Sequence, residues 1–384
     1  MRYRWAVLAA GTVAVASGAA MFVTGLPVLA PTLQDELGLS LGEIGVLLAA
    51  AWVGSTLTLL PWGLAADRYG ERVVLALGLA SCAAFLVLAA WAEGYWMLFL
   101  LLALAGAAGA SVNSASGRAV MHWFGPSERG LALGIRQSAV PAGGLVGALA
   151  VPPLAAAGGS TLALLFLAGF CVLGALTGAL VLRPGEPSDG VEPATIGRTL
   201  ADARLWRLCL GSGVYLYAQL AVIGFAVVFL HEEHGLSQGE AALVVAVSQV
   251  LAVVLRIAAG RWSDLVGSRV RPLRVVGVAV TASLVVTAVL SGGPLWLLIG
   301  ALALAGGLSM AWNGLSFAAA AELAGAHRSG AAIGFQQTVL SGIGTVAPPL
   351  FAASVSGTSW RAAFVVAALV PLAGVWALRP LREH

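Results

Sequence analysis

Lysine is absent from the sequence, and charged residues of every kind are scarce. All 20 basic side chains other than histidine are arginines, and only 10% of the 384 residues are charged while 60% are hydrophobic. A soluble domain usually has about a quarter charged residues, so this composition excludes a soluble globular protein. The net charge of +3 is spread over short polar stretches, which does not indicate a nucleic-acid partner.

Motifs for catalysis, cofactors and metals are missing as well. Cys82, Cys171 and Cys209 lie in apolar stretches without the spacing of metal ligands, so we interpret them as small core residues rather than disulfide partners. The sequence has no Walker-type phosphate-binding loop and no HExxH zinc motif. These absences argue against an enzyme and against an ATP-driven pump, and no metal or cofactor is expected.

Long apolar runs occupy most of the chain. A helix needs about 20 apolar residues to span a bilayer, whereas strands of a membrane barrel have about 10 residues and alternate in polarity. The runs are continuous and rich in alanine, leucine, valine and glycine, which predicts an all-α integral membrane protein. The first run is too long for a signal peptide, so it is predicted to be an uncleaved helix. We place twelve transmembrane helices, at about residues 5–33, 41–62, 73–92, 95–117, 129–153, 160–182, 207–230, 238–260, 274–291, 294–318, 330–354 and 360–378.

Arginines are distributed unevenly over the loops between these spans. If the N-terminus is cytoplasmic, the loops on that side contain nearly all of them, and the opposite loops contain only Arg361 together with many of the acidic residues. An excess of arginine marks the cytoplasmic side of a membrane protein. We therefore predict a multi-pass protein of the plasma membrane, embedded in the lipid bilayer with both termini in the cytoplasm.

The sequence repeats itself once. Residues 63–72 return as residues 260–269, 197 residues later, with Gly, Asp, Gly and Arg at the same spacing. A Ser-x-x-Glu pair precedes both the second and the eighth span, at Ser40 and Ser237, and this is the pattern of a capping box. Further matches, such as Leu-Ala-Gly in the fourth and tenth spans, indicate duplication of a six-helix unit.

The repeat predicts two pseudo-symmetric six-helix bundles. We place the N-terminal bundle at residues 1–182, a central cytoplasmic linker at 183–206 and the C-terminal bundle at 207–384. Duplicated halves of this kind are a known transporter design in which substrate binds near the midplane of the membrane.

The repeated loop also resembles a known family. Gly63-x-x-Ala66-Asp67-Arg68-x-Gly70-x-Arg72 is similar to the signature between the second and third helices of the major facilitator superfamily, and the second copy is similar to its weaker counterpart. The resemblance covers nearly the whole chain and implies an alternating-access transporter, which we expect to be a monomer. The gating residues that it implies are Gly63, Asp67, Arg68, Gly70, Arg72 and Arg129, together with Gly260, Asp264, Gly267 and Arg269.

Asp67 is the principal gating candidate. In such proteins this carboxylate holds the cytoplasmic face closed through the opposite half. A carboxylate beside a helix N-terminus gains about 0.3–1 kcal/mol, and the start of the eleventh span near Gly330 is the expected partner. The other interpretation is a solvated turn in which Gly70 supplies a positive φ angle.

Two arginines, but no aspartate or glutamate, lie clearly within the predicted spans and away from their ends. Arg136 lies about 10 Å into the fifth span and is followed by Gln137. Arg256 precedes Gly260 by one turn, in a pattern that resembles monocarboxylate-type facilitators, where such an arginine meets the substrate carboxylate. An arginine at this depth normally faces a cavity or a partner, so we expect both to bind an anion. The alternatives are that each side chain extends toward the membrane surface or bonds to backbone carbonyls.

Uncharged polar residues in the spans add further candidates for substrate binding. For the two asparagines the alternative is a helix-to-helix hydrogen bond, and for an aromatic residue of the seventh span it is packing or a place in the interfacial belt. The candidates are Asn113 in the fourth span, Asn313 at the matching place in the tenth, Gln336 and Gln337 opposite Arg136 in the repeat, and Tyr215 and Gln219 in the seventh span.

The sequence thus predicts a secondary active or facilitative transporter of a small organic or inorganic anion. The stretch from Arg118 to Phe124 resembles the organic-anion and nitrate/cyanate-like branches of the superfamily, which favours this interpretation. The alternative is a multidrug or metabolite efflux antiporter, because Pro141 and the glycines after it are partly similar to the helix-five motif of antiporters. A membrane sensor that does not transport is a third possibility.

Overall fold

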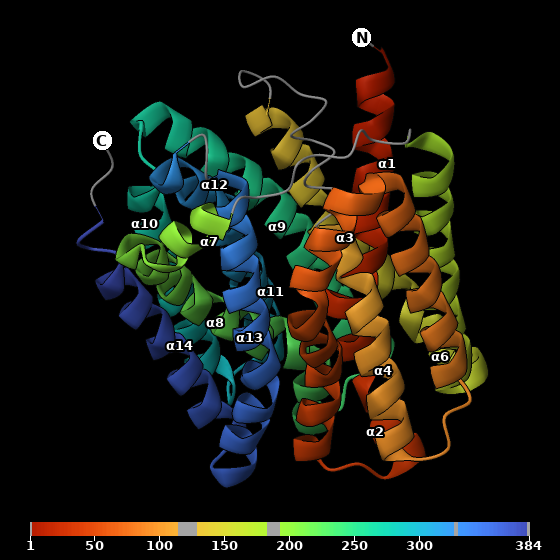
Figure 1. Ribbon diagram of the computed structural model, residues 1–384. Helices are drawn as coiled ribbons and strands as arrows, with labels where there is room; N and C mark the ends of the chain where they lie inside the picture. The colour runs from red at the N-terminus through yellow and green to blue at the C-terminus, as the bar shows by residue number, and fades with distance from the viewer. Residues whose placement is uncertain (1, 114–128, 183–192, 326–328, 382–384) are drawn as a thin grey trace. The chain divides into compact units, whose positions relative to one another are not determined.

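The computed structural model describes residues 2–113, 129–182, 193–325 and 329–381, and these residues are almost entirely helical (Figure 1). The chain divides into two compact units. Unit 1 comprises Met1–Leu39 with Ala50–Gly190, and unit 2 comprises Ser40–Ala49 with Val191–His384. The first ten residues of the predicted linker lie outside the described residues.

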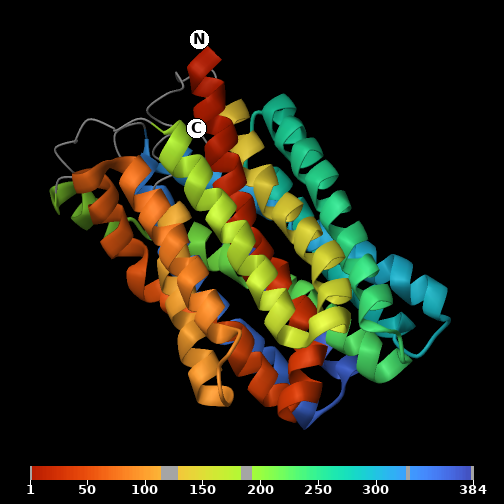
Figure 2. The same ribbon diagram turned by 90° about the vertical axis from the view of Figure 1, so that its right-hand side faces the viewer.

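In unit 1, the first span is not a uniform α-helix. It consists of α1, a short π-helix η1 and α2, and it extends to Leu37, a few residues beyond the predicted end. Two other helices of this unit contain two spans each, because α3 bends at Gly70 and α6 reverses at Gly158 and Gly159. Figure 2 shows the two limbs of α6, in yellow and yellow-green, meeting at this reversal. The helices are α1 (Arg2–Ala19), η1 (Ala20–Gly25), α2 (Leu26–Leu37), α3 (Leu41–Ala89), α4 (Tyr95–Gly109) and α6 (Arg129–Val181).

In unit 2, one nearly fully buried helix forms the core. This helix, α8, packs against α13 and α14, as Figure 1 shows in green and blue. The short α7 precedes it and lies in the predicted linker. The helices are α7 (Pro193–Leu200), α8 (Ala203–His234), α9 (Gln238–Val266), α10 (Val270–Leu290), α11 (Leu295–Ser309), α12 (Trp312–Ala324), α13 (Ser329–Gly357) and α14 (Trp360–Ala377).

The described residues contain eleven helical segments that are long and apolar enough to cross a membrane. One of them, Ile135–Val181, includes the reversal in α6, so counting its two limbs separately gives the twelve predicted spans. Another, Leu295–Ala324, joins α11 and α12. The all-α membrane fold predicted from the sequence is therefore confirmed, although the predicted tenth span ends six residues too early.

Both predicted capping boxes are present. The Ser40 amide donates to Glu43 Oε2 at 2.8 Å while the Glu43 amide donates to Ser40 Oγ at 3.3 Å. Ser237 and Glu240 make the same reciprocal pair at 2.9 and 3.3 Å. Each box follows a glycine in the left-handed region, Gly38 or Gly235, which ends the preceding helix. The repeated sequence thus starts the second and the eighth span with the same local structure.

Glycines bring the second and fourth spans into close contact. A Cβ atom on Gly54 would collide with the Ala103 carbonyl oxygen, and one on Gly106 would collide with the Ala51 backbone. The matching Gly306 in α11 is similarly covered by Ser248 of α9. Small residues let helix backbones approach closely where lipid provides no hydrophobic drive for association.

Candidate functional site

The fourth and tenth spans are interrupted at equivalent places. In unit 1, α4 ends at Gly109, and the Asn113 amide then donates to the Ala110 carbonyl at 3.1 Å. In unit 2, α11 ends at Ser309 before α12 begins at Trp312. Both interruptions lie 15 residues after the start of the span, about 22 Å along a helix. Backbone groups freed at this depth need internal partners, because each unsatisfied group costs several kcal/mol in hydrocarbon.

Arg136 reaches the fourth span just beyond its interruption. It lies in the first limb of α6 and is only 6% exposed. Its Nη2 donates to the Asn113 carbonyl at 3.3 Å, and its Nη1 donates to Gln137 Oε1 at 3.0 Å. The structure therefore brings Asn113 of the fourth span together with Arg136 and Gln137, which the sequence proposed as neighbours in the fifth.

Arg256 reaches the interruption in unit 2. This half-buried residue of α9 donates from Nε to the Met310 carbonyl at 2.8 Å. The same carbonyl accepts from Asn313 Nδ2 at 3.3 Å, and Asn313 Nδ2 is also 3.3 Å from Gln219 Oε1. A continuous polar chain thus connects α9, the interruption, α12 and α8. It includes three of the predicted residues, Arg256, Asn313 and Gln219.

The remaining polar candidates of unit 2 lie in its helix contacts. Gln336 is fully buried in α13 and donates from Nε2 to Ser316 Oγ of α12, with Ser212 Oγ of α8 at 3.4 Å. Tyr215 is fully buried as well, with its ring against Gly277 and Gly374. Gln337 is half-buried.

Tyr215 also packs edge-to-face on Trp312, with ring centroids 6.3 Å apart. Its environment is that of a packed side chain, as the sequence analysis allowed, and a role of Tyr215 or Gln337 in substrate binding stays a prediction.

The two copies of the repeated loop differ in their backbone. Gly70 has φ 79° and ψ 163°, while Gly267 has φ 61° and ψ 30° and ends α9 in the left-handed region. The positive φ angle predicted for Gly70 is therefore present. Arg68 is exposed and lies over the Tyr69 ring at 5.4 Å. The side chains of Asp67 and Arg129 and the exposure of Gly330 lie outside what the structure describes, so the gate through Asp67 stays a prediction.

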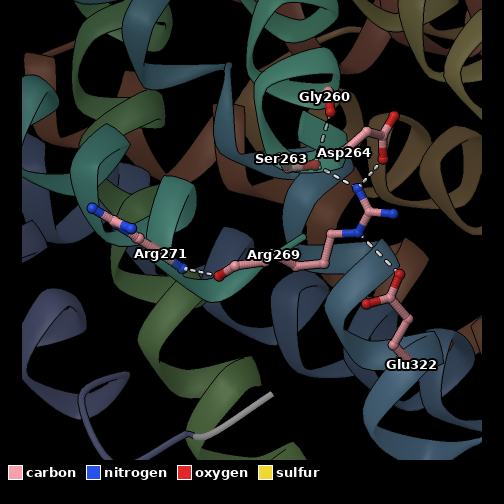
Figure 3. A network of polar contacts seen from close by, with 7 residues as sticks. Gly260, Ser263, Asp264, Arg269, Arg271 and Glu322 are labelled. Carbon is pink, nitrogen blue, oxygen red and sulfur yellow. Dashed lines mark hydrogen bonds and ion pairs between the residues drawn. The ribbon is translucent and has the colours of Figure 1, made fainter. Parts of the chain in front are cut away.

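The second copy contains a network of charged side chains around Arg269 (Figure 3). Arg269 donates from Nε to Glu322 Oε1 at 2.9 Å and from Nη1 to Asp264 Oδ1 and Ser263 Oγ. Partial burial lowers the pKa of Arg269, but the hydrogen bonds and charges of Asp264 and Glu322 outweigh this effect and raise its pKa overall. Arg269 therefore stays charged throughout the physiological pH range, and it ties the α9–α10 turn to the end of α12.

Glu322 was missed by the sequence analysis. It lies in the last turn of α12, inside the candidate span Leu295–Ala324. Other candidate spans also include an acid near one end, such as Glu43 or Glu240, so the expectation that no carboxylate lies in a span is wrong at the ends of the spans. The predicted span ends at residue 318, four residues before this acid. The available sequence signal was its position: Glu322 follows the predicted tenth span on the side of the membrane where the arginines of the second copy of the repeated loop are expected.

No group of three or more histidine, cysteine, aspartate or glutamate side chains that could hold a metal occurs among the described residues. The cysteines Cys82 and Cys171 are buried, with their Sγ atoms 3.8 Å apart, and Cys82 Sγ lies 3.6 Å from Met21 Sδ.

Comparisons with known proteins agree with these features. The sequence profile of the Major Facilitator Superfamily matches residues 8–348, and it matches residues 209–384 as well. The chain is 34% identical to an uncharacterized MFS-type transporter of Mycobacterium tuberculosis, over 97% of this chain and 84% of the relative. It is 30% identical to a probable nitrate/nitrite antiporter of Thermus thermophilus, over 70% of this chain and 62% of that protein.

Two further similarities are more limited in what they show. A hexuronate transporter of Bacillus subtilis is 28% identical over 32% of this chain and 29% of its own length. Among solved structures, an inward-facing, unoccupied bacterial homologue of the human lysosomal transporter Spinster has a TM-score of 0.75 at 18% identity. That comparison covers 98% of this chain and 95% of the other, and at this identity it shows the fold alone.

Proposed function

Because the chain belongs to the major facilitator superfamily and is a membrane transporter rather than an enzyme, we propose that it carries a small organic or inorganic anion by alternating access. The observation that carries this proposal is the presence of one arginine deep in a span of each unit, Arg136 and Arg256. An arginine at the bilayer centre costs about 2.5–3.5 kcal/mol on insertion scales, so its presence needs a reason.

The surroundings of these arginines support an anionic substrate. Both guanidinium groups donate to neutral oxygens, from Gln137, Asn113 and Met310. A carboxylate or nitrate is negatively charged and can accept two parallel hydrogen bonds from one guanidinium, so it binds such donors more strongly than a neutral oxygen does.

The relatives support the same class of substrate. One is named as a probable nitrate/nitrite antiporter and another as a hexuronate transporter, so both an inorganic anion and an organic carboxylate occur among proteins similar to this chain. We propose Arg136 with Gln137 and Arg256 with Asn313 and Gln219 as the anion-binding groups of the two units.

Uptake into proteoliposomes tests the proposal. Labelled nitrate and glucuronate are offered to the wild-type protein and to Arg136→Gln and Arg256→Gln. Loss of a charged hydrogen-bond donor is expected to lower uptake by about tenfold or more. Arg271→Gln is the matched control, because Arg271 is an exposed arginine of unit 2 outside both clusters. The proposal is contradicted if both arginine variants take up either anion at the rate of the wild-type protein.

A thermal-shift screen of the purified protein separates this proposal from the efflux alternative. Stabilisation by small anions supports the anion transporter, whereas stabilisation only by drug-like cations favours the exporter.

A further inference from the structure

Both interrupted spans are held by a guanidinium group. Arg136 donates to the Asn113 carbonyl, three residues beyond the end of the interruption at Ala110, and Arg256 donates to the Met310 carbonyl inside the other interruption. Tight i+3 bonds occur at both places, such as Ala311 N to Leu308 O at 3.0 Å. A short tightened stretch in the middle of a helix is a frequent site of bending.

The two arginines come from helices that are not equivalent in the repeat. The counterpart of Arg136 is Gln336, which bonds to Ser316 and Ser212 instead. The counterpart of Arg256 is Leu59, which is buried and apolar. Duplication therefore does not explain why each unit has this contact. A guanidinium reaching the interrupted span from a different helix in each unit indicates that the contact itself has a role.

In unit 1, α3 satisfies a backbone carbonyl of the fourth span with neutral donors alone. Thr58 Oγ1 and Trp62 Nε1 each donate to the Ala107 carbonyl at 2.7 Å, one turn before the interruption. Neutral donors are thus sufficient to satisfy a carbonyl of the fourth span. A positive charge is not required for that purpose, yet an arginine contacts both interrupted spans.

We propose that Arg136 and Arg256 are positioning residues for the interrupted spans, and that the transported anion competes with the Asn113 and Met310 carbonyls for their guanidinium groups. The inference rests on the proposed anion transport and adds a link between substrate binding and a movable backbone segment. Without substrate, the arginine holds the interruption. With substrate, it turns to the anion and the interruption loosens.

The chemistry of the guanidinium group favours this exchange. Its five N–H donors lie in one plane, so presenting a pair of them to a carboxylate or nitrate requires the whole group to reorient. The bond to an anion is stronger than the bond to a neutral carbonyl, so the anion takes the donor when both compete. In unit 2, Asn313 Nδ2 at 3.3 Å remains as a weaker donor to the Met310 carbonyl after Arg256 has left.

The sequence allows the Met310 carbonyl to be observed alone. Met310–Ala311 is the only Met-Ala pair in the chain, and Asn113–Ser114 is the only Asn-Ser pair. Labelling the whole protein in lipid bilayers with carbonyl-¹³C methionine and ¹⁵N alanine gives one directly bonded ¹³C–¹⁵N pair. A second sample with carbonyl-¹³C asparagine and ¹⁵N serine reports in the same way on unit 1. Solid-state NMR then reads the carbonyl shift, which moves upfield when a hydrogen bond is lost.

We expect Arg256→Gln to move the Met310 resonance upfield and to leave the Asn113 resonance in place, which also shows that the variant is folded. Arg136→Gln should do the reverse. In the wild-type protein, nitrate or glucuronate should move the Met310 resonance in the same direction as Arg256→Gln does. An unchanged Met310 resonance in Arg256→Gln overturns the inference. It is also overturned if the Met310 resonance of the wild-type protein does not move when an anion that the protein transports is added.

The conservative variant separates positioning from simple structural support. Lysine at position 256 keeps a charged donor for the Met310 carbonyl but cannot bind an anion through two parallel N–H groups. Arg256→Lys should therefore keep the Met310 resonance near its wild-type position while the KM for the anion rises about tenfold. A KM that stays at the wild-type value in Arg256→Lys contradicts a shared guanidinium.

The failure of the inference can be told from failure of the proposed function. If neither nitrate nor glucuronate is transported or bound, the proposed function fails, whatever the resonances do. If an anion is transported and both arginine variants reduce uptake but no carbonyl resonance moves, the function stands and the inference falls.

Discussion

Arg269 donates to Glu322 at 2.9 Å across 53 residues of sequence, and this pair connects the turn after α9 with the last turn of α12. Both side chains are partly accessible, with 25% and 56% exposure. Exposed ion pairs usually contribute about 0.2–1 kcal/mol. We expect Glu322→Gln to lower the free energy of unfolding by less than about 1 kcal/mol, with a smaller loss at high salt because salt screens exposed pairs.

Thermal unfolding at low and high salt measures this effect. Glu233→Gln is a control, because Glu233 is an exposed acid in the last turn of α8 and is not part of this ion pair. A loss of several kcal/mol, or a loss that salt does not change, would show that Glu322 has a different role.

Glu36 is expected to stabilise the second limb of α6. The Ser160 amide donates to Glu36 Oε1 at 2.9 Å and the Ser160 hydroxyl donates to Oε2, so the carboxylate caps the helix that starts after the glycine reversal. Loss of a helix cap typically costs about 0.5–2 kcal/mol. Glu36→Ala should lower the unfolding free energy by this amount in chemical denaturation, whereas Glu93→Ala at a nearby exposed position should change it little.

Gly54 is expected to tolerate no side chain. Its place in α3 lies against the Ala103 carbonyl, so the methyl group of Gly54→Ala would force α3 and α4 apart. Overpacking of this kind costs about 1–3 kcal/mol. Gly169→Ala in α6 is the control, because a Cβ there meets nothing within 4 Å and the change should stabilise the helix slightly. Equal thermal stability of both variants would be inconsistent with the close approach.

The three cysteines should resist water-soluble thiol reagents in the folded protein. Cys82, Cys171 and Cys209 are all buried, so maleimide labelling is expected to be slow until the protein is denatured. Mass spectrometry of the labelled protein checks this expectation. Fast labelling of any of them in the native state would show that its helix contacts open readily.

Because the native cysteines are expected to react slowly with maleimide, a cysteine introduced by mutation can be used to test the proposed gate. A cysteine introduced at an inner loop position should report opening of the cytoplasmic face in wild type and in Asp67→Asn. Loss of a charge–dipole contact worth about 0.3–1 kcal/mol should shift the gate about two- to fivefold toward the open state. Unchanged accessibility together with unchanged transport would remove Asp67 as a gating residue.

The sequence predicted best what depends on long stretches of residues. Twelve apolar runs, the capping boxes at Ser40 and Ser237 and the glycine turn at Gly70 follow from hydropathy and local propensity, and the structure has all of them. The ends of spans were less certain. Glu322 was placed outside the tenth span because a single acid in the last turn lowers hydropathy without ending the helix.

Contacts between residues far apart in the chain could not be predicted from the sequence. Arg256 was singled out for its charge in an apolar run, but nothing in its neighbourhood points to a carbonyl 54 residues later. The interruptions themselves contain alanine and methionine, and glycines such as Gly109 and Gly307 lie just before them. Glycines also occur in uninterrupted parts of the spans, so these did not mark the interruptions. Tyr215 was chosen as a polar aromatic, and its packing against Gly277 and Gly374 depends on two other helices.

The two contacts between arginine and an interrupted span also differ in the order in which their members are synthesised. Asn113 precedes Arg136 by 23 residues, whereas Arg256 precedes Met310 by 54. At about 5–20 residues per second, Arg256 is made roughly 3–11 s before its carbonyl. During insertion of the nascent chain, unit 1 therefore exposes an incomplete backbone first and unit 2 exposes a charge first. Although the two halves share one fold, the insertion machinery must therefore accommodate a backbone carbonyl before its arginine in unit 1 and an arginine before its carbonyl in unit 2.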